Sequence, residues 1–405
     1  MNKKIALLVV RKNYREIDWI IPLIYKIKHK FKIITFFQNK NILRNFSKEN
    51  VSLYKKWKKI DSFHFFPTTK HIFLSKLLTL FSFGNFFLKK LAKDYIRKKF
   101  YSEKYLNNIL SKNNFYNCEL KLIFHEIAKN TAWINTFLNH KNVKIIKFPD
   151  GTPPRGNYKI DKIKKKKIEY IKNLFIITST KHDLPHYSSH YNLKNIRIIG
   201  YPRYENKWIK SFKKNKISNS RRIFLIGCKQ YKPQHRESVK SQIFSIMNST
   251  LLIKNSLTIF KPHPAQSISE LKMFLSKFKA SSWEISNNHI LNYKNSAELF
   301  IGFHRSSSVL DALAANLPTI KLWSFKAWDK EDINEQQYLK RYNINNSILT
   351  ELGLTKLVLN ENDLKKMIKS SKTLKKKLLK KQKKNFAKLN IDNKKANEVL
   401  REIIK

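Results

Sequence analysis

KIALLVV, residues 4–10, comes almost at the start of the chain and contains the apolar run Ile5–Val10, which has the length of one buried strand. A helical pattern over Trp19–Lys28 follows it, and then a second apolar run, Lys32–Phe37. Strand, helix and strand in this order predict a βαβ unit with two parallel strands.

The same alternation recurs in two series of short apolar runs separated by helical stretches such as Thr131–Leu138. The first series continues with Leu120–Phe124, Val143–Phe148, Leu174–Thr178 and Ile196–Ile199. The second consists of Arg222–Gly227, Leu257–Phe260, Ile285–Ser286, Leu299–Gly302 and Thr319–Leu322. We therefore predict an α/β chain with two doubly wound, Rossmann-like domains.

A chain of 405 residues is long enough for two such domains. The polar, basic stretch Lys207–Ser220 has no apolar period and follows the last strand of the first series, so we expect the boundary there. The predicted domains are residues 1–210 and 221–362. Residues 363–405 are expected to form Lys-rich helices that pack back across the molecule.

The net charge is +55 and the pI about 10.2, so the surface should attract polyanions such as anionic lipids, acidic glycans, nucleotides or nucleic acid. The basic residues are spread over the whole chain and no nucleic-acid module is recognisable, so we expect no nucleic-acid partner. A genome rich in A and T would also encode many Lys, Asn and Ile residues, which leaves open how much of the charge serves binding.

Neither a disulfide framework nor a zinc site is indicated, because Cys118 and Cys228 are far apart in sequence and have no second thiol or histidine at ligand spacing. The apolar run Ile5–Val10 is too short for a signal peptide. We therefore expect a cytoplasmic protein.

Residues 71–100 mix Leu, Ile and Phe with many basic residues. Lys76 and Gly84 interrupt the apolar stretch, which argues against a membrane-spanning helix. The pattern favours a basic amphipathic helix on the anionic inner surface of the cytoplasmic membrane, and a core helix with solvent-facing lysines is the alternative.

Glycine is scarce, with seven residues where average usage would give about 28. Five of the seven lie at or just after the carboxyl ends of predicted strands, which is the edge where doubly wound sheets bind ligands. They are Gly151, Gly156, Gly200, Gly227 and Gly302.

The strand Leu257–Phe260 is followed by Lys261-Pro262-His263-Pro264, whose prolines hold the lysine and histidine in a rigid extended loop. Cationic donors fixed there could stabilise the charge that develops on a departing phosphate. We predict a catalytic role for His263 and donor binding by Lys261.

The strand Leu299–Gly302 leads into a serine-rich helix start, which would seat a phosphate if its amides, hydroxyls and a nearby arginine converge. Asp311, one turn into the helix, could reach a ribose hydroxyl. The residues predicted to bind the donor here are Arg305, Ser306, Ser307, Ser308 and Asp311, with Gly227 at the end of the neighbouring strand.

A loop rich in Gly and Pro follows the strand Val143–Phe148 and begins with Asp150. Transfer to a hydroxyl needs a base opposite the phosphate site, and Asp150 is our candidate. His125 and Glu126, which end the strand before Val143–Phe148, are the reserve candidates for this base. The other residues predicted to line this side of the cleft are Gly151, Thr152, Arg155 and Arg203.

Four motifs in order resemble the bacterial GT-B transferases of surface glycans: Asp150-Gly151, the run Gly200–Tyr204, Lys261–Pro264 and Ser306–Ser308. That group includes the sialyltransferase-like and Kdo-transferase-like enzymes and the related glycerophosphotransferases of teichoic acid synthesis. The resemblance covers about residues 120–325.

The resemblance implies two Rossmann-like domains facing a cleft, with Asp150 as base and with His263 and Ser306–Ser308 on a cytidine nucleotide. The glycerophosphotransferases have His-Gly-Thr-Pro where this chain has Asp150-Gly151-Thr152-Pro153, which leaves the donor open. Pro149 also stands where a second acid is often found.

No Asp-x-Asp metal motif follows a suitable strand, so we expect a metal-independent enzyme without a cofactor. The leading hypothesis is an inverting glycosyltransferase of capsule or lipopolysaccharide-type glycans, with a nucleotide-sugar donor and a glycan or glycolipid acceptor. The alternatives are a CDP-glycerol-type polyol phosphotransferase, a sugar-nucleotide 2-epimerase and a basic nucleic-acid-binding protein.

Overall fold

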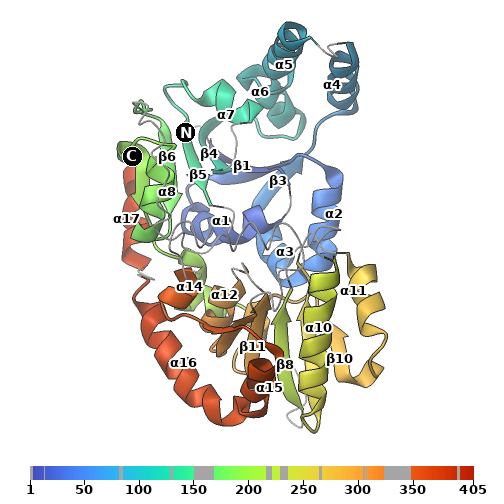
Figure 1. Cartoon of the computed structure of the whole chain (residues 1–405). Helices are drawn as coiled ribbons and strands as arrows, with labels where there is room; N and C mark the ends of the chain where they lie inside the picture. Colours follow the sequence, from blue (N-terminus) through green and yellow to red (C-terminus); the bar gives the residue numbers. More distant parts are fainter. Residues whose placement is uncertain are drawn as a thin grey trace.

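The computed structural model contains two parallel sheets, one in each half of the chain (Figure 1). It describes residues 3–12, 14–81, 85–127, 131–149, 168–215, 221–228, 236–263, 267–303, 306, 308–322, 348–389 and 393–405.

The first sheet has the strand order β3-β2-β1-β4-β5-β6-β7. Its strands are β1 (Lys3–Val10), β2 (Lys32–Phe37), β3 (Asp61–Phe65), β4 (Cys118–Glu126), β5 (Lys144–Phe148), β6 (Leu174–Thr178) and β7 (Ile196–Ile198). The first strand, β1, lies in the middle of the sheet because each of its faces packs against an apolar core. Ala6, Leu8 and Val10 belong to one core, and Ile5 and Leu7 belong to the other. A strand with cores on both faces must be apolar where it is buried, as Ile5–Val10 is.

The second sheet has the order β10-β9-β8-β11-β12-β13. Its strands are β8 (Arg222–Gly227), β9 (Ser256–Lys261), β10 (Trp283–Ile285), β11 (Leu299–Phe303), β12 (Thr319–Leu322) and β13 (Lys356–Val358). All the pairings recorded in both sheets are parallel. The strand order reverses between β1 and β4 and between β8 and β11, and such reversals mark the crevices where α/β sheets bind ligands.

Helices cover both sheets. In the first half they are α1 (Arg15–Ile27), α2 (Lys40–Glu49), α3 (Val51–Lys58), α4 (Thr69–Phe81), α5 (Phe86–Phe100), α6 (Glu103–Lys112), α7 (Ala132–Phe137), α8 (Leu184–Ser188) and α9 (Asn206–Lys210). In the second half they are α10 (Arg236–Leu251), α11 (Ile268–Leu275), α12 (Ser308–Ala314), α14 (Ile348–Glu351), α15 (Glu361–Lys369), α16 (Ser371–Ala387) and α17 (Asn393–Ile404).

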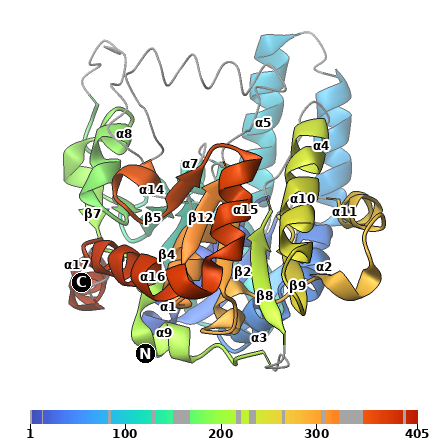
Figure 2. The ribbon, with the colours of Figure 1, turned by 60° about the horizontal axis from the view of Figure 1, so that its bottom comes forward.

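One apolar core is shared by the two halves. It includes Trp19 and Ile20 of α1 on one side and Leu225 of β8 and Leu313 of α12 on the other. The outer face of the second sheet has its own core, covered by α10, α11 and α15, and α10 and α15 lie side by side in Figure 2. A continuous core between the sheets fixes their relative position, because separating them would expose apolar surface.

The Lys-rich end of the chain does pack back across the molecule. In α16, Gln382 accepts a hydrogen bond from the Thr319 amide at 2.9 Å and donates to the Thr319 carbonyl at 2.7 Å. The last helix, α17, contacts β7 of the first sheet (Figure 1). The two halves are therefore also joined along this side.

Residues 71–100 differ from the single amphipathic helix that we expected, because they belong to two helices, α4 and α5, which pack on each other. Two short edge strands, β3 and β13, were also missed by the sequence patterns, since β3 contains Asp61 and His64 and β13 has only three residues. In the described part of the chain, no helix is both long and apolar enough to cross a bilayer.

Gly227 lies where strand β8 meets its neighbours most closely. A Cβ at this position would lie 2.5 Å from Phe300 Cζ and 2.5 Å from Ser308 Oγ. Gly302 is less confined, because its Cβ would lie 3.3 Å from Phe300 and Val309. Packing alone therefore requires glycine at position 227.

We expect Gly227→Ala to lower the free energy of unfolding by about 1–3 kcal/mol, as overpacking of a core does. Gly302→Ala should cost less, because its neighbours need to move only slightly. Urea unfolding of both variants measures the difference, and equal losses would contradict the packing that we describe.

Candidate functional site

Four neighbouring strands each place one residue in a row near the carboxyl edge of the first sheet. In the order of the strands, these residues are Phe36, Val9, His125 and Lys147. Just beyond them, at the reversal between β1 and β4, is a cavity of about 310 Å³. It is lined by Val9, Arg11, Lys12, Gln38, Tyr101, Thr131, Ala132 and Trp133.

His125 lies under this cavity and is fully buried. Its Nδ1 is 2.6 Å from the Glu126 carbonyl and must donate to it, so Nε2 is left to accept from Thr131 Oγ1 at 3.0 Å. Burial, with Lys147 and Arg11 nearby, lowers the pKa of His125 to about 3, against the opposing hydrogen bond to the Glu126 carbonyl. The imidazole is neutral, and both of its nitrogens are hydrogen-bonded. It thereby holds Thr131 in the wall of the cavity.

The same edge carries buried positive charge. Lys147 is 1% exposed, and its Nζ donates to Tyr191 Oη at 3.0 Å. Burial, together with Arg11, lowers the pKa of Lys147 to about 8. On the rim, Lys12 Nζ lies 3.8 Å from Glu126 Oε1. The cavity therefore has cationic walls, which suits an anionic or hydroxyl-rich ligand.

At the carboxyl edge of the second sheet, the registers align Lys261, Gly227, Gly302 and Lys321 across four strands. Lys261 reaches the first half of the chain, because its Nζ donates to the Glu49 carbonyl at 3.2 Å. A small cavity there is lined by Tyr14, Glu49, Lys261, Pro262, His263, Ile268 and Asn287. The Lys261–His263 turn therefore faces the first half of the chain.

Burial lowers the pKa of Lys261 to about 8, although Glu49 and Asp18 partly oppose this effect. Burial likewise raises the pKa of Glu49, which Lys261 partly offsets. The lysine ammonium thus lies at the small cavity, and among the described residues no carboxylate is hydrogen-bonded to it, so its charge is only partly neutralised before an anion binds.

The predicted serine motif lies beside these residues. Ser306 and Ser308 are in contact through their hydroxyl oxygens, and the Ser308 hydroxyl faces Gly227. The Ser306 amide donates to the Phe303 carbonyl at 3.0 Å. The structure thus brings Ser306, Ser308, Gly227 and Lys261 to one edge, at the reversal between β8 and β11.

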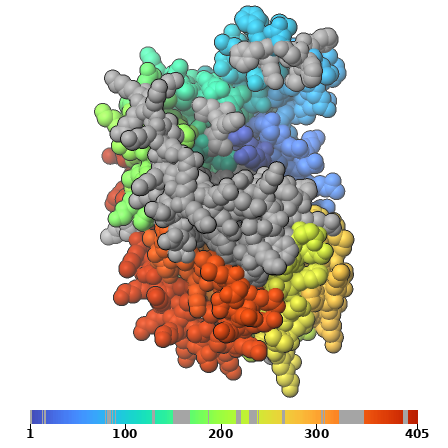
Figure 3. Space-filling model, in the orientation of Figure 1, coloured from blue at the N-terminus to red at the C-terminus, as the bar shows by residue number. Residues whose placement is uncertain are grey.

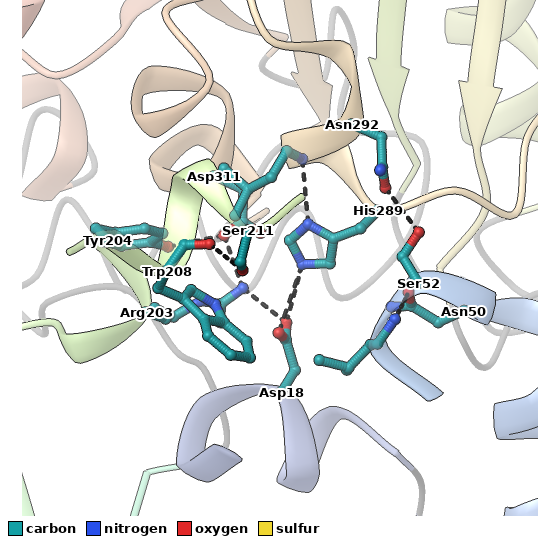
Figure 4. Close-up of polar contacts among 12 residues, drawn as sticks. Asp18, Asn50, Ser52, Arg203, Tyr204, Trp208, Ser211, His289, Asn292 and Asp311 are labelled. Carbon is teal, nitrogen blue, oxygen red and sulfur yellow. Dashed lines mark hydrogen bonds and ion pairs between the residues drawn. The ribbon is translucent and has the colours of Figure 1, made fainter. Parts of the chain in front are cut away.

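Asp311 and Arg203 were predicted on opposite sides of the cleft, and the structure joins them directly (Figure 4). Arg203 Nη2 lies 2.7 Å from Asp311 Oδ1 and 2.7 Å from Asp18 Oδ2. The Tyr204 hydroxyl is 3.0 Å from the same Asp311 oxygen. Because Asp311 belongs to α12 and Asp18 to α1, the arginine links the two halves of the chain.

His289 completes this network from the second half. Its Nδ1 accepts from the Leu291 amide at 3.1 Å, so Nε2 carries a proton and points at Asp18, 3.5 Å away. Burial would raise the pKa of Asp18, but Arg203 and His289 hold it at about 2. A second bridge, from Ser52 of α3 to Asn292 at 3.1 Å, lies nearby.

Several predicted site residues lie outside the described residues: Asp150, Gly151, Thr152, Arg155, Arg305 and Ser307. Their roles stay predictions. The chain just before Asp150 is described, and the end of β5 at Lys147 and Phe148 lies beside His125.

Sequence patterns missed Arg11, Lys147, Asp18 and His289. Arg11 directly follows the first strand, and Lys147 lies at the end of the strand before the Asp150 loop. Both could have been recognised as basic residues at the carboxyl ends of predicted strands. Asp18 and His289 gave none, because a single charged residue in a helix or loop is usually solvent-exposed.

No family model matches the sequence, and no curated protein sequence is similar to it. Solved structures do match its fold over nearly its whole length. The co-structure of S. aureus MnaA with UDP has a TM-score of 0.56 at 12% identity and covers 99% of this chain and 96% of its own. The UDP-GlcNAc 2-epimerase of Methanocaldococcus jannaschii has a TM-score of 0.52 at 14% identity and covers 99% of both chains.

A third structure, the wall teichoic acid polymerase TagF with CDPG, has a TM-score of 0.51 at 11% identity and covers 98% of this chain and 87% of its own. The chain has the GT-B fold. Structural matches at such low sequence identity establish that the chain has two Rossmann-like domains in this arrangement. They do not establish which reaction it catalyses.

The buried pairs of Arg203 can be compared with an exposed one. Arg203→Met should lower the free energy of unfolding by about 3–5 kcal/mol, because it leaves the Asp18 and Asp311 carboxylates buried without their partner. Arg197→Met removes an exposed pair with Glu402 and should cost about 0–1 kcal/mol. Denaturant unfolding measures both, and similar costs would show that Arg203 does not hold the halves together.

Proposed function

We propose that this protein is a metal-independent, inverting glycosyltransferase that moves a sugar from a nucleotide donor to a hydroxyl of a glycan or glycolipid. The product would be a surface glycan of the capsule or lipopolysaccharide type. The observations that carry the proposal are two ligand-ready edges: a cationic cavity on the first sheet, and a Lys-Ser edge on the second whose lysine reaches the first half of the chain.

Donor binding is assigned to the second edge. Lys261, the Ser306 and Ser308 hydroxyls and His263 offer positive charge and hydrogen bonds at the β8/β11 reversal, where an α/β sheet binds a nucleotide. Arg305 and Ser307 belong to the same motif by sequence. Asp311 is not assigned to the ribose in this proposal, because its carboxylate accepts hydrogen bonds from Arg203 and Tyr204. Its part is to link the two halves of the chain.

Acceptor binding is assigned to the cavity of the first edge, and this second site favours a transferase over an epimerase. An epimerase acts on its nucleotide sugar alone, whereas transfer needs a second substrate opposite the first. Arg11, Lys12, Gln38 and Thr131 line that cavity with side chains that can donate hydrogen bonds, which suits the hydroxyl oxygens of an acceptor.

The proposed reaction is one displacement. Asp150 takes the proton of the acceptor hydroxyl as its oxygen bonds to the donor's anomeric carbon. The bond from that carbon to the phosphate breaks on the opposite face, and the leaving nucleotide keeps the electron pair while His263, Lys261 and the serines stabilise its charge. Gly151, Thr152 and Arg155 would shape the loop around the acceptor.

Two other reactions remain candidates on specific grounds. A polyol phosphotransferase is favoured by Thr152-Pro153 in the Asp150 loop and by the shared fold with TagF. A 2-epimerase is favoured by the fold shared with UDP-GlcNAc 2-epimerases. Incubation with CMP-, UDP- and CDP-linked donors, with and without glycan acceptors, separates the three. Our proposal requires nucleotide release that depends on an acceptor glycan, and epimer formation without an acceptor would refute it.

We further propose that the enzyme works in the cytoplasm, at the anionic inner face of the cytoplasmic membrane, where a glycolipid acceptor would be found. The net charge of +55 supports attraction to that surface. No nucleic-acid partner is part of the proposal.

Asp150→Ala should reduce turnover by about a hundredfold or more while leaving nucleotide affinity unchanged, because a base acts on the acceptor and not on the donor. Glu169→Ala, an exposed acid downstream, is the matched control and should behave like the wild type. Acceptor-dependent nucleotide release and calorimetric titration with CMP or UDP report the two quantities. Loss of binding and turnover together would contradict this separation of roles.

Lys261 predicts a pH dependence. Its pKa of about 8 means that the ammonium loses its proton as pH rises above 8 in the free protein, and a bound phosphate favours the charged form. The dissociation constant for CMP or UDP should therefore increase above pH 8, by up to about tenfold per pH unit.

Lys261→Met should weaken binding and remove this dependence, whereas Lys272→Met on the exposed surface of α11 should change neither. Titrations from neutral to alkaline pH test the three proteins in parallel. A wild-type affinity that stays flat through pH 8 would place the phosphate away from Lys261.

A further inference from the structure

We propose that α4 and α5 form a membrane-inserting hairpin whose apolar tip enters an anionic lipid bilayer. The hairpin stands out from the body of the first half in Figures 1 and 2, and its surface is raised at the upper right of Figure 3. The inference gives a physical means to the membrane location proposed above, and it needs none of the proposed chemistry.

Exposed apolar side chains are concentrated on this hairpin. Among the described residues, seven of the fifteen exposed large hydrophobic side chains lie on α4 and α5, although these helices are a small part of the chain. Leu80 is 71% exposed and Phe87 is 65% exposed. The others are Ile72, Phe73, Leu88, Leu91 and Tyr95. So dense a group marks an interaction surface, whereas isolated exposed hydrophobic residues are ordinary.

The order of residues divides the hairpin into an apolar tip and a cationic collar. The described residues at the free end, 77–81 of α4 and 85–88 with the start of α5, contain no charged residue and seven large apolar ones. Cations border them on both sides, with exposed Lys76 before and exposed Lys90 and Lys93 after. An apolar end flanked by lysines is the pattern of a segment that enters the headgroup region of a bilayer and pairs with anionic lipids.

The face of α5 fits the same orientation. Leu88, Leu91 and Tyr95 are spaced by three and four residues, so they lie along one side of the helix. Tyr95 is nearest the root, where its ring lies 5.2 Å from Lys99 Nζ. An aromatic ring with a polar edge beside a lysine suits the interface between headgroups and water.

The root of the hairpin is fixed to the body of the protein. His71 of α4 stacks on Phe100 at the end of α5, with ring centroids 4.6 Å apart, and Tyr101 packs edge-on against the same histidine. Tyr101 also lines the 310 Å³ cavity of the first sheet. A bilayer that holds the hairpin would therefore lie at the same end of the molecule as the proposed acceptor site.

Charge favours a bilayer over a second copy of the chain as the occupant. Residues 69–100 contain eight Lys or Arg residues and one Asp, a net charge of +7 (8 − 1), within a chain of net charge +55. Two copies would bring like charges together, whereas anionic headgroups would neutralise the collar while the acyl chains take up the tip.

The test is flotation of the purified full-length chain with vesicles of phosphatidylglycerol mixed with phosphatidylcholine, and with phosphatidylcholine alone. We expect binding to the mixed vesicles. Leu80→Ser with Phe87→Ser should weaken partitioning about tenfold or more, since each removes an apolar side chain from the lipid. Leu193→Ser with Leu359→Ser, which alters two exposed leucines elsewhere, is the matched control and should bind like the wild type.

Two further arms distinguish insertion from surface attraction. Lys90→Gln with Lys93→Gln should weaken binding more than Lys380→Gln with Lys381→Gln on α16, which removes the same charge elsewhere. Leu80→Trp should add fluorescence that lipids brominated on their acyl chains quench, measured above the wild-type background. Circular dichroism confirms that each variant is folded.

Equal losses in the hairpin and control variants, or a Leu80→Trp signal that brominated lipids leave unchanged, would overturn the proposal. So would a concentration-dependent dimer that Leu80→Ser with Phe87→Ser abolishes, because the hairpin would then bind a second copy. These readouts contain no nucleotide or acceptor, so their failure is distinct from failure of the proposed transfer.

Discussion

Arg203 is the residue on which the relation between the two halves depends. Its guanidinium lies between Asp18 of α1 and Asp311 of α12, 2.7 Å from each. A buried cation with two carboxylates, a tyrosine and a histidine around it has its partners satisfied only when both halves are in place. The shared apolar core supplies the bulk of the contact, and this network selects one arrangement of it.

That arrangement decides what the two sheet edges can do. With the halves held in this position, Lys261 of β9 reaches the end of α2, and the Lys261–His263 turn faces the first half of the chain. We propose that the cationic cavity beside Arg11 and the Lys-Ser edge form the two sides of one cleft. Burial lowers the pKa of one lysine on each edge, Lys147 and Lys261, so a bound anion would replace part of the solvation that each ammonium has lost.

The sequence was enough to predict the sheets because parallel strands buried on both faces must be apolar runs, as Ile5–Val10 and Ile223–Gly227 show. It failed where that rule does not apply, at the edge strand with Asp61 and His64 and at the three-residue β13. In the site, rim residues such as Lys261 and Ser308 could be found because they follow strands at fixed positions. Partners such as Asp18 with Arg203 could not, because 185 residues separate them and no local pattern encodes the contact.

If donor and acceptor occupy opposite edges of one cleft, a crystal structure of the chain with CMP or UDP and an acceptor glycan will show both ligands in place. We expect the nucleotide phosphate at Ser306, Ser308 and Lys261, and the glycan in the cavity beside Arg11 and Gln38. A nucleotide phosphate seated in the Arg11 cavity, or ligands on faces that do not share the cleft, would contradict it.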